Sequence, residues 1–148
     1  MQITYKKAAR DDIGAVTDLL CLVYKNHTRG DLLMENERHF ADADQAFFLA
    51  LDGEKPVGVT HGSIRHEYVN GANDGRKGYL EGIYVLPEYR LRGIAAALAG
   101  GVERWAASRG CREFASDCLL DNTDSYSFHL RIGFAETERC IFFLKTIG

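Results

Sequence analysis

The alternation of apolar and polar residues in the first half of the chain predicts two helices and three strands. Residues 3–8 alternate as a strand does. Residues 11–26 place apolar side chains at helical spacing, with Asp11 or Asp12 available as the N-cap. Residues 32–43 predict a second helix. Residues 45–66 predict two strands joined by "DGEK", an Asp-Gly hairpin turn.

The second half of the chain continues this α/β pattern. After a loop rich in Gly, Asn and Asp over 67–78, strands are predicted at 79–86, 111–117 and 136–145. Helices are predicted at 93–109 and 122–132, ended by Gly110 and Gly133. The order βααβββαβαβ predicts a mixed α/β sheet with helices on both faces.

Composition limits the class of protein. At 148 residues, with 46% hydrophobic and 26% charged residues, the chain is expected to form one globular domain, 1–148. A net charge of −3 argues against nucleic-acid binding through bulk charge. The four cysteines show no CxxC pair and no metal-type spacing with histidine, so no metal is expected. The N-terminus lacks an apolar signal core and no run could span a bilayer, which favours a cytoplasmic protein with reduced cysteines.

The stretch "VLPEYRLRGIAAALAG", residues 85–100, carries the clearest chemical signal. A strand ends at a proline, passes two arginines and a glycine, and becomes a small-residue helix. Unpaired N–H groups and the positive end of the dipole at a helix start favour an anion, and Arg90 and Arg92 add forked donors. Taken alone, the stretch is equally compatible with a solvated turn. A Walker loop and a three-glycine dinucleotide motif are both missing.

The context of this turn resembles the GCN5-related N-acetyltransferase (GNAT) superfamily. Arg90, Gly93 and Ala95 follow "LEGIYVLP", and a strand and "NTDSYSFHLRIGF" come after them. The resemblance implies that acetyl-CoA is the co-substrate and that its pyrophosphate lies on the turn, Ile94 included. It also implies that Ile83, Tyr84 and Val85 offer backbone groups to the pantetheine and the acetyl carbonyl, and that Asn122 binds the pantetheine arm.

Within this superfamily, "SIRHEYVNG", "LEGIYVLPEYR", "GCREFASD" and "GFAETERCIFF" resemble the aminoglycoside 6'-N-acetyltransferases. The resemblance implies an aminoglycoside substrate in an acidic cleft and a homodimer, in which the apolar "CIFFLK" could serve at the interface or in the core. The substrate-binding residues carried over by matching phrases are Tyr24, His27, Tyr68, Glu81, Asp117 and Glu138.

Glu81 and Asp117 are the predicted catalytic residues. Glu81 interrupts an apolar central strand, where a carboxylate needs a partner or an open cleft. Strand alternation would place it on the same face as Ile83 and Val85. Asp117 ends a strand, where α/β sheets gather ligands, although a turn-capping role is also common. We expect direct attack of an amine on the thioester, with Glu81 as first and Asp117 as second proton acceptor. The backbone N–H groups near Ile83 to Val85 are expected to stabilise the oxyanion.

Several points stay open on the sequence. Many superfamily members have a Tyr seven positions after this Asn as the acid that protonates the thiolate, and this chain has His129 there. Tyr126, His129 or water are therefore the candidates for the general acid. A different acceptor, such as a polyamine or a protein N-terminus, and a non-catalytic acyl-CoA-binding module are the alternative functions.

Overall fold

The computed structural model describes residues 2–73 and 75–148. A five-stranded sheet has the order β1-β2-β3-β4-β5, in which only β4 and β5 run parallel. Its strands are β1 (Ile3–Lys7), β2 (Gln45–Asp52), β3 (Lys55–Arg65), β4 (Lys77–Val85) and β5 (Phe114–Ser116). Its helices are α1 (Ile13–Leu20), α2 (Arg29–Phe40), α3 (Ile94–Ser108) and α4 (Thr123–Arg131).

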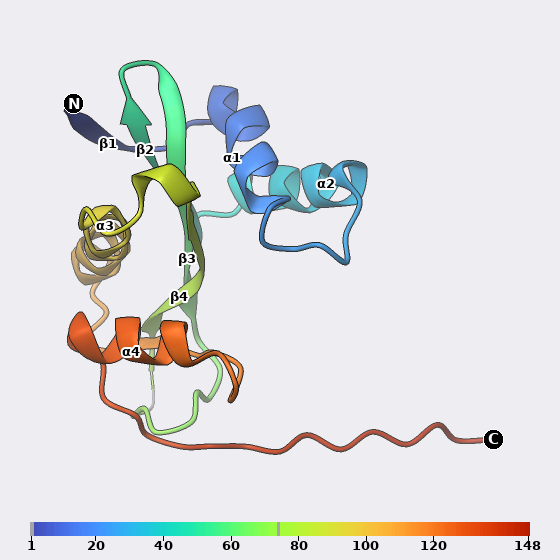
Figure 1. Ribbon diagram of the computed structural model, residues 1–148. Helices are drawn as coiled ribbons and strands as arrows, with labels where there is room; N and C mark the ends of the chain where they lie inside the picture. The colour runs from blue at the N-terminus through green and yellow to red at the C-terminus, as the bar shows by residue number, and fades with distance from the viewer. Residues whose placement is uncertain (1, 74) are drawn as a thin grey trace.

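The predicted α/β class and the helices on both faces of the sheet are confirmed. Figure 1 shows α1 and α2 on one side of the sheet and α3 on the other. On the first side, Leu20 and Leu32 pack with Phe47 and Val59 of the sheet. On the second side, Leu98 of α3 packs with Val57 and others. These three helices thus bury apolar side chains against the sheet face that each covers.

Local signals place most of the element boundaries. Thr28 caps α2 by accepting a hydrogen bond from the Asp31 N–H at 3.1 Å. Gly53 adopts φ 62° in the predicted turn between β2 and β3, a conformation that favours glycine.

α1 ends at Leu20 rather than at 26, and β5 is shorter than its predicted strand. The predicted loop over 67–78 ends where β4 begins at Lys77, and Asp74 lies outside the described residues.

The predicted strand at 136–145 is wrong for the single chain. These residues are extended and exposed, and within residues 75–148 of the described chain no strand follows α4. An extended segment becomes a strand only where another strand pairs with its backbone. In Figure 1 this end of the chain runs below α4 and away from the sheet.

Across the described residues, none of the helices combines the length and the apolar character that a membrane crossing requires.

Candidate active site

The turn between β4 and α3 has the geometry of an anion cradle. A short 3-10 helix, η2 (Pro87–Tyr89), follows β4, and Gly93 then occupies the N-cap of α3 with φ 78°. Leu91 also has a positive φ, 63°, and its side chain is fully exposed. The left-handed turn leaves the first N–H groups of α3 directed outward at the positive end of the helix dipole.

Three cations surround this turn. Arg90 donates from Nε to the Val85 carbonyl at 3.0 Å, and its guanidinium carbon lies 5.4 Å from the Tyr84 ring centroid. Arg92 and Lys55 both lie over the Tyr89 ring, at 5.5 and 5.6 Å from its centroid. Lys55, from the start of β3, is a residue that the sequence analysis missed. The geometry agrees with the predicted anion site.

A β-bulge in β4 turns Glu81 away from the face that alternation predicted. His61 pairs with Gly82 and Gly62 with Leu80, so Glu81 is the extra residue between two register pairs. Ile83 packs on the α3 side, whereas Glu81 lines a cavity under α1 and α2. The prediction that Glu81 shares a face with Ile83 and Val85 is therefore wrong, because the bulge shifts the alternation by one residue.

The Glu81 carboxylate is held by two residues of the neighbouring strand. Ser63 donates to Oε2 at 2.5 Å, while Arg65 donates from Nε to Oε2 at 3.0 Å and from Nη2 to Oε1 at 2.7 Å. This bidentate pair satisfies the charge of a partly buried carboxylate. Neither partner was expected from the sequence, since their contact with Glu81 depends on the register of β3 against β4.

Arg65 and Tyr79 connect Glu81 to Asp117. The Arg65 guanidinium carbon lies 3.5 Å from the Tyr79 ring centroid, and the Tyr79 hydroxyl donates to Asp117 Oδ2. Burial, followed by this hydrogen bond to Asp117, raises the pKa of Tyr79, so the phenol stays protonated as a donor. The two predicted catalytic carboxylates thus belong to one polar network, and Tyr79 is a further residue missed by the sequence.

The cavity beside this network has a volume of about 300 Å³. Burial raises the pKa of Tyr24, and the negative charges of Glu81, Glu35 and Asp117 raise it further. Tyr24 therefore lies within the field of three carboxylates. The lining residues are Leu20, Tyr24, His27, Leu32, Glu35, Asn36, His39, Gln45, His61 and Glu81.

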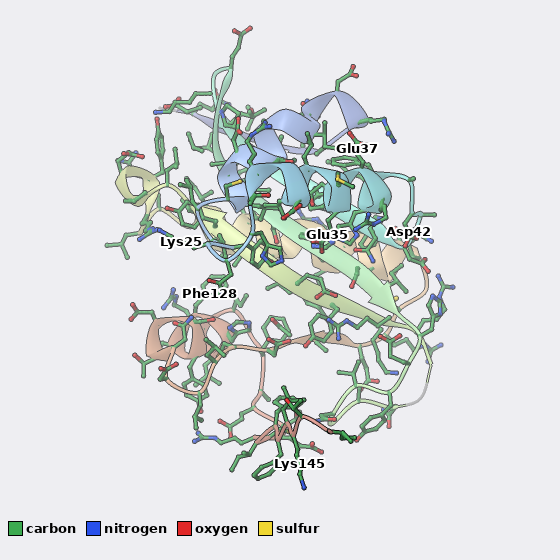
Figure 2. The ribbon with its side chains drawn as sticks, turned by 90° about the vertical axis from the view of Figure 1, so that its right-hand side faces the viewer. Lys25, Glu35, Glu37, Asp42, Phe128 and Lys145 are labelled. Carbon is green, nitrogen blue, oxygen red and sulfur yellow. The ribbon has the colours of Figure 1, made fainter. Side chains whose placement is uncertain are left out.

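Glu35 on α2 is the most informative lining residue that the sequence analysis missed. Its Oε1 lies 3.4 Å from His39 Nε2, one helical turn later. Figure 2 labels Glu35 on α2, in the helical layer that covers this side of the sheet. The i,i+4 spacing of Glu35 and His39 in the predicted helix was a usable signal, because it places both side chains on one face.

A second cavity, of about 360 Å³, lies on the α3 side and has different chemistry. Its lining includes Lys6, Lys7 and Arg104 and contains neither Glu81 nor Tyr24. A positive lining repels a polycation, so the cavity around Tyr24 is the better candidate for an amine substrate.

Three of the predicted substrate residues lie apart from the cavity lining. Asp117 instead accepts from the Tyr79 hydroxyl. Tyr68, in the loop before β4, is 66% exposed, and Glu138 is exposed in the extended segment after α4. Tyr24 and His27 do line the cavity, with ring centroids 6.4 Å apart.

Asn122 caps α4, because its Oδ1 accepts from the Ser125 N–H at 3.2 Å. The roles of Tyr68, Glu138 and Asn122 stay predictions.

The two candidates for the general acid have different surroundings. His129 Nε2 lies 2.8 Å from Ser116 Oγ, and Nδ1 lies 2.6 Å from the Ser125 carbonyl oxygen. Both of its ring nitrogens are therefore engaged within the protein. Tyr126 is 38% exposed, and its hydroxyl interacts with the Glu136–Arg139 ion pair.

β4 continues beyond its pairing with β5 toward the cradle. β5 pairs only with Gly78, Tyr79 and Leu80, whereas β4 continues to Val85. In the described part of the chain, the β4 backbone from 81 to 85 thus has no strand partner on its β5 side. An extended, amide-containing ligand can hydrogen-bond such an edge, which suits the predicted role of Ile83, Tyr84 and Val85.

The cationic turn, the open β4 edge and the acidic cavity are compatible with the class of protein that comparison with known proteins shows. The model of the acetyltransferase (GNAT) family matches residues 14–134. The chain belongs to this family.

Its relatives are more specific than the family. It is 44% identical to an aminoglycoside N(6')-acetyltransferase type 1 of Acinetobacter baumannii over 131 residues, 88% of this chain and 89% of the relative. A Serratia marcescens enzyme of the same name is 36% identical over 93% of this chain and 95% of its own.

Solved structures agree with the sequence relatives. The chain is similar to AAC(6')-Iy in complex with a bisubstrate analogue, CoA-S-monomethyl-acetylneamine, with a TM-score of 0.94 and 35% identity over 99% of this chain and all of that one. It is also similar to the aminoglycoside 6'-N-acetyltransferase AAC(6')-Ih of Acinetobacter baumannii, with a TM-score of 0.90 and 38% identity over the same shares.

The buried His61 predicts a pH-dependent stability. Its Nε2 donates to Gln45 Oε1 at 2.6 Å, and burial followed by the nearby His39 and Arg65 lowers its pKa to about 3. The unfolded chain binds a proton near pH 6.5 that the native chain refuses, so stability falls as pH falls below that value. Between pH 6.5 and 5 the free energy of unfolding should drop by up to about 1.4 kcal/mol per pH unit from this group.

Urea denaturation of the His61→Gln variant checks this expectation, because the variant should lose that part of the slope. His27→Gln is the matched control, since His27 is exposed. Equal slopes for the wild type and His61→Gln would show that His61 is not the responsible group.

Proposed function

We propose that this protein is an aminoglycoside 6'-N-acetyltransferase, which moves the acetyl group of acetyl-CoA to the 6'-amine of the antibiotic and so confers resistance. The observation that carries the proposal is that β4 contributes Glu81 to the acidic cavity around Tyr24 and then leads into the cationic turn at Gly93. One site suits a polycationic acceptor and the other a pyrophosphate. The relatives at 44% identity are named for this reaction.

The turn fits acetyl-CoA as co-substrate. Gly93 puts no side chain between a pyrophosphate and the N–H groups of Ile94 and Ala95, and a Cβ built at Gly93 would meet nothing within 4 Å. Arg90 and Arg92 would neutralise the phosphates. The unpaired β4 edge would hold the pantetheine, with Asn122 as its partner from α4. Bound acetyl-CoA would supply the activated acyl group.

The three carboxylates fit the acceptor. An aminoglycoside carries several ammonium groups. A recessed site lined by Glu35 and Glu81, within the field of Asp117, concentrates positive charge although the net charge of the protein is only −3. The same field raises the pKa of the bound amine and opposes its deprotonation. Strong binding and reactivity thus make opposite demands on the same carboxylates.

A proton must leave the amine before it attacks the thioester carbonyl. We assign Glu81 as the acceptor, directly or through a water, with Asp117 as the second candidate. Arg65 and Ser63 hold the Glu81 carboxylate, which fixes its orientation. An incoming ammonium group competes with Arg65 for these oxygens. The backbone N–H groups at Ile83 to Val85 would stabilise the oxyanion.

Protonation of the leaving thiolate is assigned to Tyr126 or water in preference to His129. Both ring nitrogens of His129 are engaged by Ser116 and Ser125. Tyr126 is partly exposed on the same helix.

The setting proposed for this enzyme is the cytoplasm, where acetyl-CoA is available, and its assembly is proposed to be a homodimer. Polyamines and protein N-termini are the alternative acceptors, since the same co-substrate frame serves them. A recessed cavity lined by carboxylates favours a small polycation over a peptide.

The experiment that tests the function is product analysis. Incubation with acetyl-CoA and an aminoglycoside with a free 6'-amine should release free thiol and yield one product acetylated at that amine, located by NMR. Spermidine and an N-terminal peptide, used at equal concentration, should release thiol at least tenfold more slowly. Faster turnover of either comparison amine would replace the proposed acceptor. Tight acetyl-CoA binding with no thiol release on any amine would indicate a binding module.

Glu81→Gln should lower kcat/KM for the aminoglycoside by about 10²- to 10⁴-fold, the range usual for an acid–base group, with little change in KM for acetyl-CoA. The matched variant is Arg65→Gln, which breaks the same ion pair but keeps the carboxylate. It should lose much less activity. Equal losses in the two variants would reduce Glu81 to a structural member of the ion pair.

Gly93→Ala should raise KM for acetyl-CoA by about tenfold, because its Cβ would project into the proposed pyrophosphate position, and tenfold corresponds to about 1.4 kcal/mol. Gly110→Ala is the matched control, since Gly110 has φ 86° and open surroundings at the other end of α3. Both variants should lose similar stability in thermal unfolding. A KM for acetyl-CoA that rises equally in both would remove Gly93 from the cradle.

A further inference from the structure

The cavity of about 360 Å³ on the α3 side of the sheet has no part in the proposed reaction. It lies where β1 and β2 face the middle of α3, and we call it the β1–α3 cavity. Its lining includes neither the residues around Tyr24 nor those of the turn at Gly93. Its volume falls in the range of cavities that hold small organic ligands. The β1–α3 cavity is therefore a candidate for a second ligand.

The register of β1 against β2 forms one wall of the β1–α3 cavity. Lys7 pairs with Phe48, and Tyr5 pairs with Ala50. Residues opposite each other in a sheet share a face, as do residues two apart on one strand. Ala50 and Phe48 pack with the apolar cluster of α3. Tyr5, Lys7 and Phe48 thus all lie on the face that α3 covers.

The helix α3 forms the opposite wall with small residues at its centre. Ala97 and Gly101, one turn apart, line the cavity, and Arg104 and Trp105 follow one turn later on the same side of the helix. A Cβ at Gly101 would lie 3.2 Å from the Phe48 ring, so the helix backbone comes close to β2 there. The small side chains leave the neighbouring space in front of β1 open.

The Trp105 side chain is held in place by contacts outside the cavity. The guanidinium carbon of Arg109 lies 5.7 Å from its ring centroid. Arg109 in turn donates from Nη1 to the Ala43 carbonyl at 2.6 Å and from Nη2 to Asp44 Oδ1 at 3.2 Å. Because the indole is already fixed by these contacts, a ligand that packs against it has little ordering cost to overcome.

The charges that line the β1–α3 cavity are all positive. Lys6 is offset by Asp12, whose Oδ2 lies 3.0 Å from Lys6 Nζ. Among residues 2–73 and 75–148, the ion pairs include no carboxylate partner for Lys7 or Arg104. The described lining contains no acidic side chain either. Two cations without a counter-charge at a recessed site favour an anion.

We propose that the β1–α3 cavity binds a small organic anion that carries an aromatic ring. The ring would pack against Phe48 and Trp105, and the acidic group would accept hydrogen bonds from Lys7 and Arg104. An inorganic anion would leave the aromatic lining uncovered, and a neutral aromatic molecule would leave the two cations unpaired. The inference does not depend on the proposed acetyltransferase reaction.

The first test uses the fluorescence of Trp105, which is the single tryptophan of the chain and therefore reports on this cavity. Titration with 4-phenylbutanoate should give a saturable change with a Kd on the order of 1 mM or tighter. The matched probes are 4-phenylbutanamide, which lacks the charge, and hexanoate, which lacks the ring. Each should bind at least about tenfold more weakly. Equal affinity for the acid and the amide, or no saturable change with the acid, would overturn the proposal.

The second test locates the probe with variants. Arg104→Gln and Lys7→Gln should each weaken binding of 4-phenylbutanoate by about tenfold, because each removes a charged donor. Ala97→Leu should also weaken it by at least about tenfold by filling the cavity, with thermal unfolding showing that the variant is folded. The matched control is Arg38→Gln, an exposed cation on α2 at the other face of the sheet, which should bind the probe as the wild type does. Unchanged affinity in Arg104→Gln, or in a folded Ala97→Leu, would overturn the proposal, as would an equal loss in Arg38→Gln.

Discussion

The register shift between β3 and β4 is the constraint on which the candidate active site depends. With regular alternation Glu81 would point into the packed core under α3, where a carboxylate is costly to bury. The bulge turns both Glu81 and Gly82 toward α1 and α2. A Cβ at position 82 would lie 2.3 Å from the Tyr24 hydroxyl, so Gly82 lets this hydroxyl approach the strand. One extra residue thus brings a carboxylate and a tyrosine together in the same cavity.

Arg65 offsets the free-energy cost of placing a carboxylate on a central strand. Its contacts also link the two carboxylates of the site. The bidentate pair neutralises Glu81 and stacks its cation on Tyr79, which in turn donates to Asp117. Two acids that would repel each other are separated by a cation and a phenol. The cavity keeps a negative field, to which Glu35 contributes from α2. A substrate ammonium group would enter a site in which one cation is already balanced against the carboxylates.

Local sequence patterns predicted the elements that are determined by interactions within a few residues. The helix at 122–132 and the hairpin turn at "DGEK" were predicted because periodicity and turn chemistry act within a few residues. The cradle at Gly93 was predicted for the same reason. The bulge and the Arg65 partner could not be, since each depends on residues 16 or more positions apart meeting across strands. Glu35 had a local signal in its spacing from His39, but its place in the cavity depends on how α2 packs on the sheet. The proposed role of Glu81 came from its place on an apolar strand and from the resemblance to known enzymes, whereas its orientation is set by the register of β3 against β4.

Residues 136–145 show the same limit. The apolar run at 140–144 is typical of a strand covered on both faces, but such a run carries no information on which backbone pairs with it. In the described chain these residues are extended, and Ile141, Phe142, Phe143 and Leu144 are each at least 80% exposed. The sequence thus predicted the extended conformation but not its pairing, because the pairing of a strand depends on residues far from it along the chain.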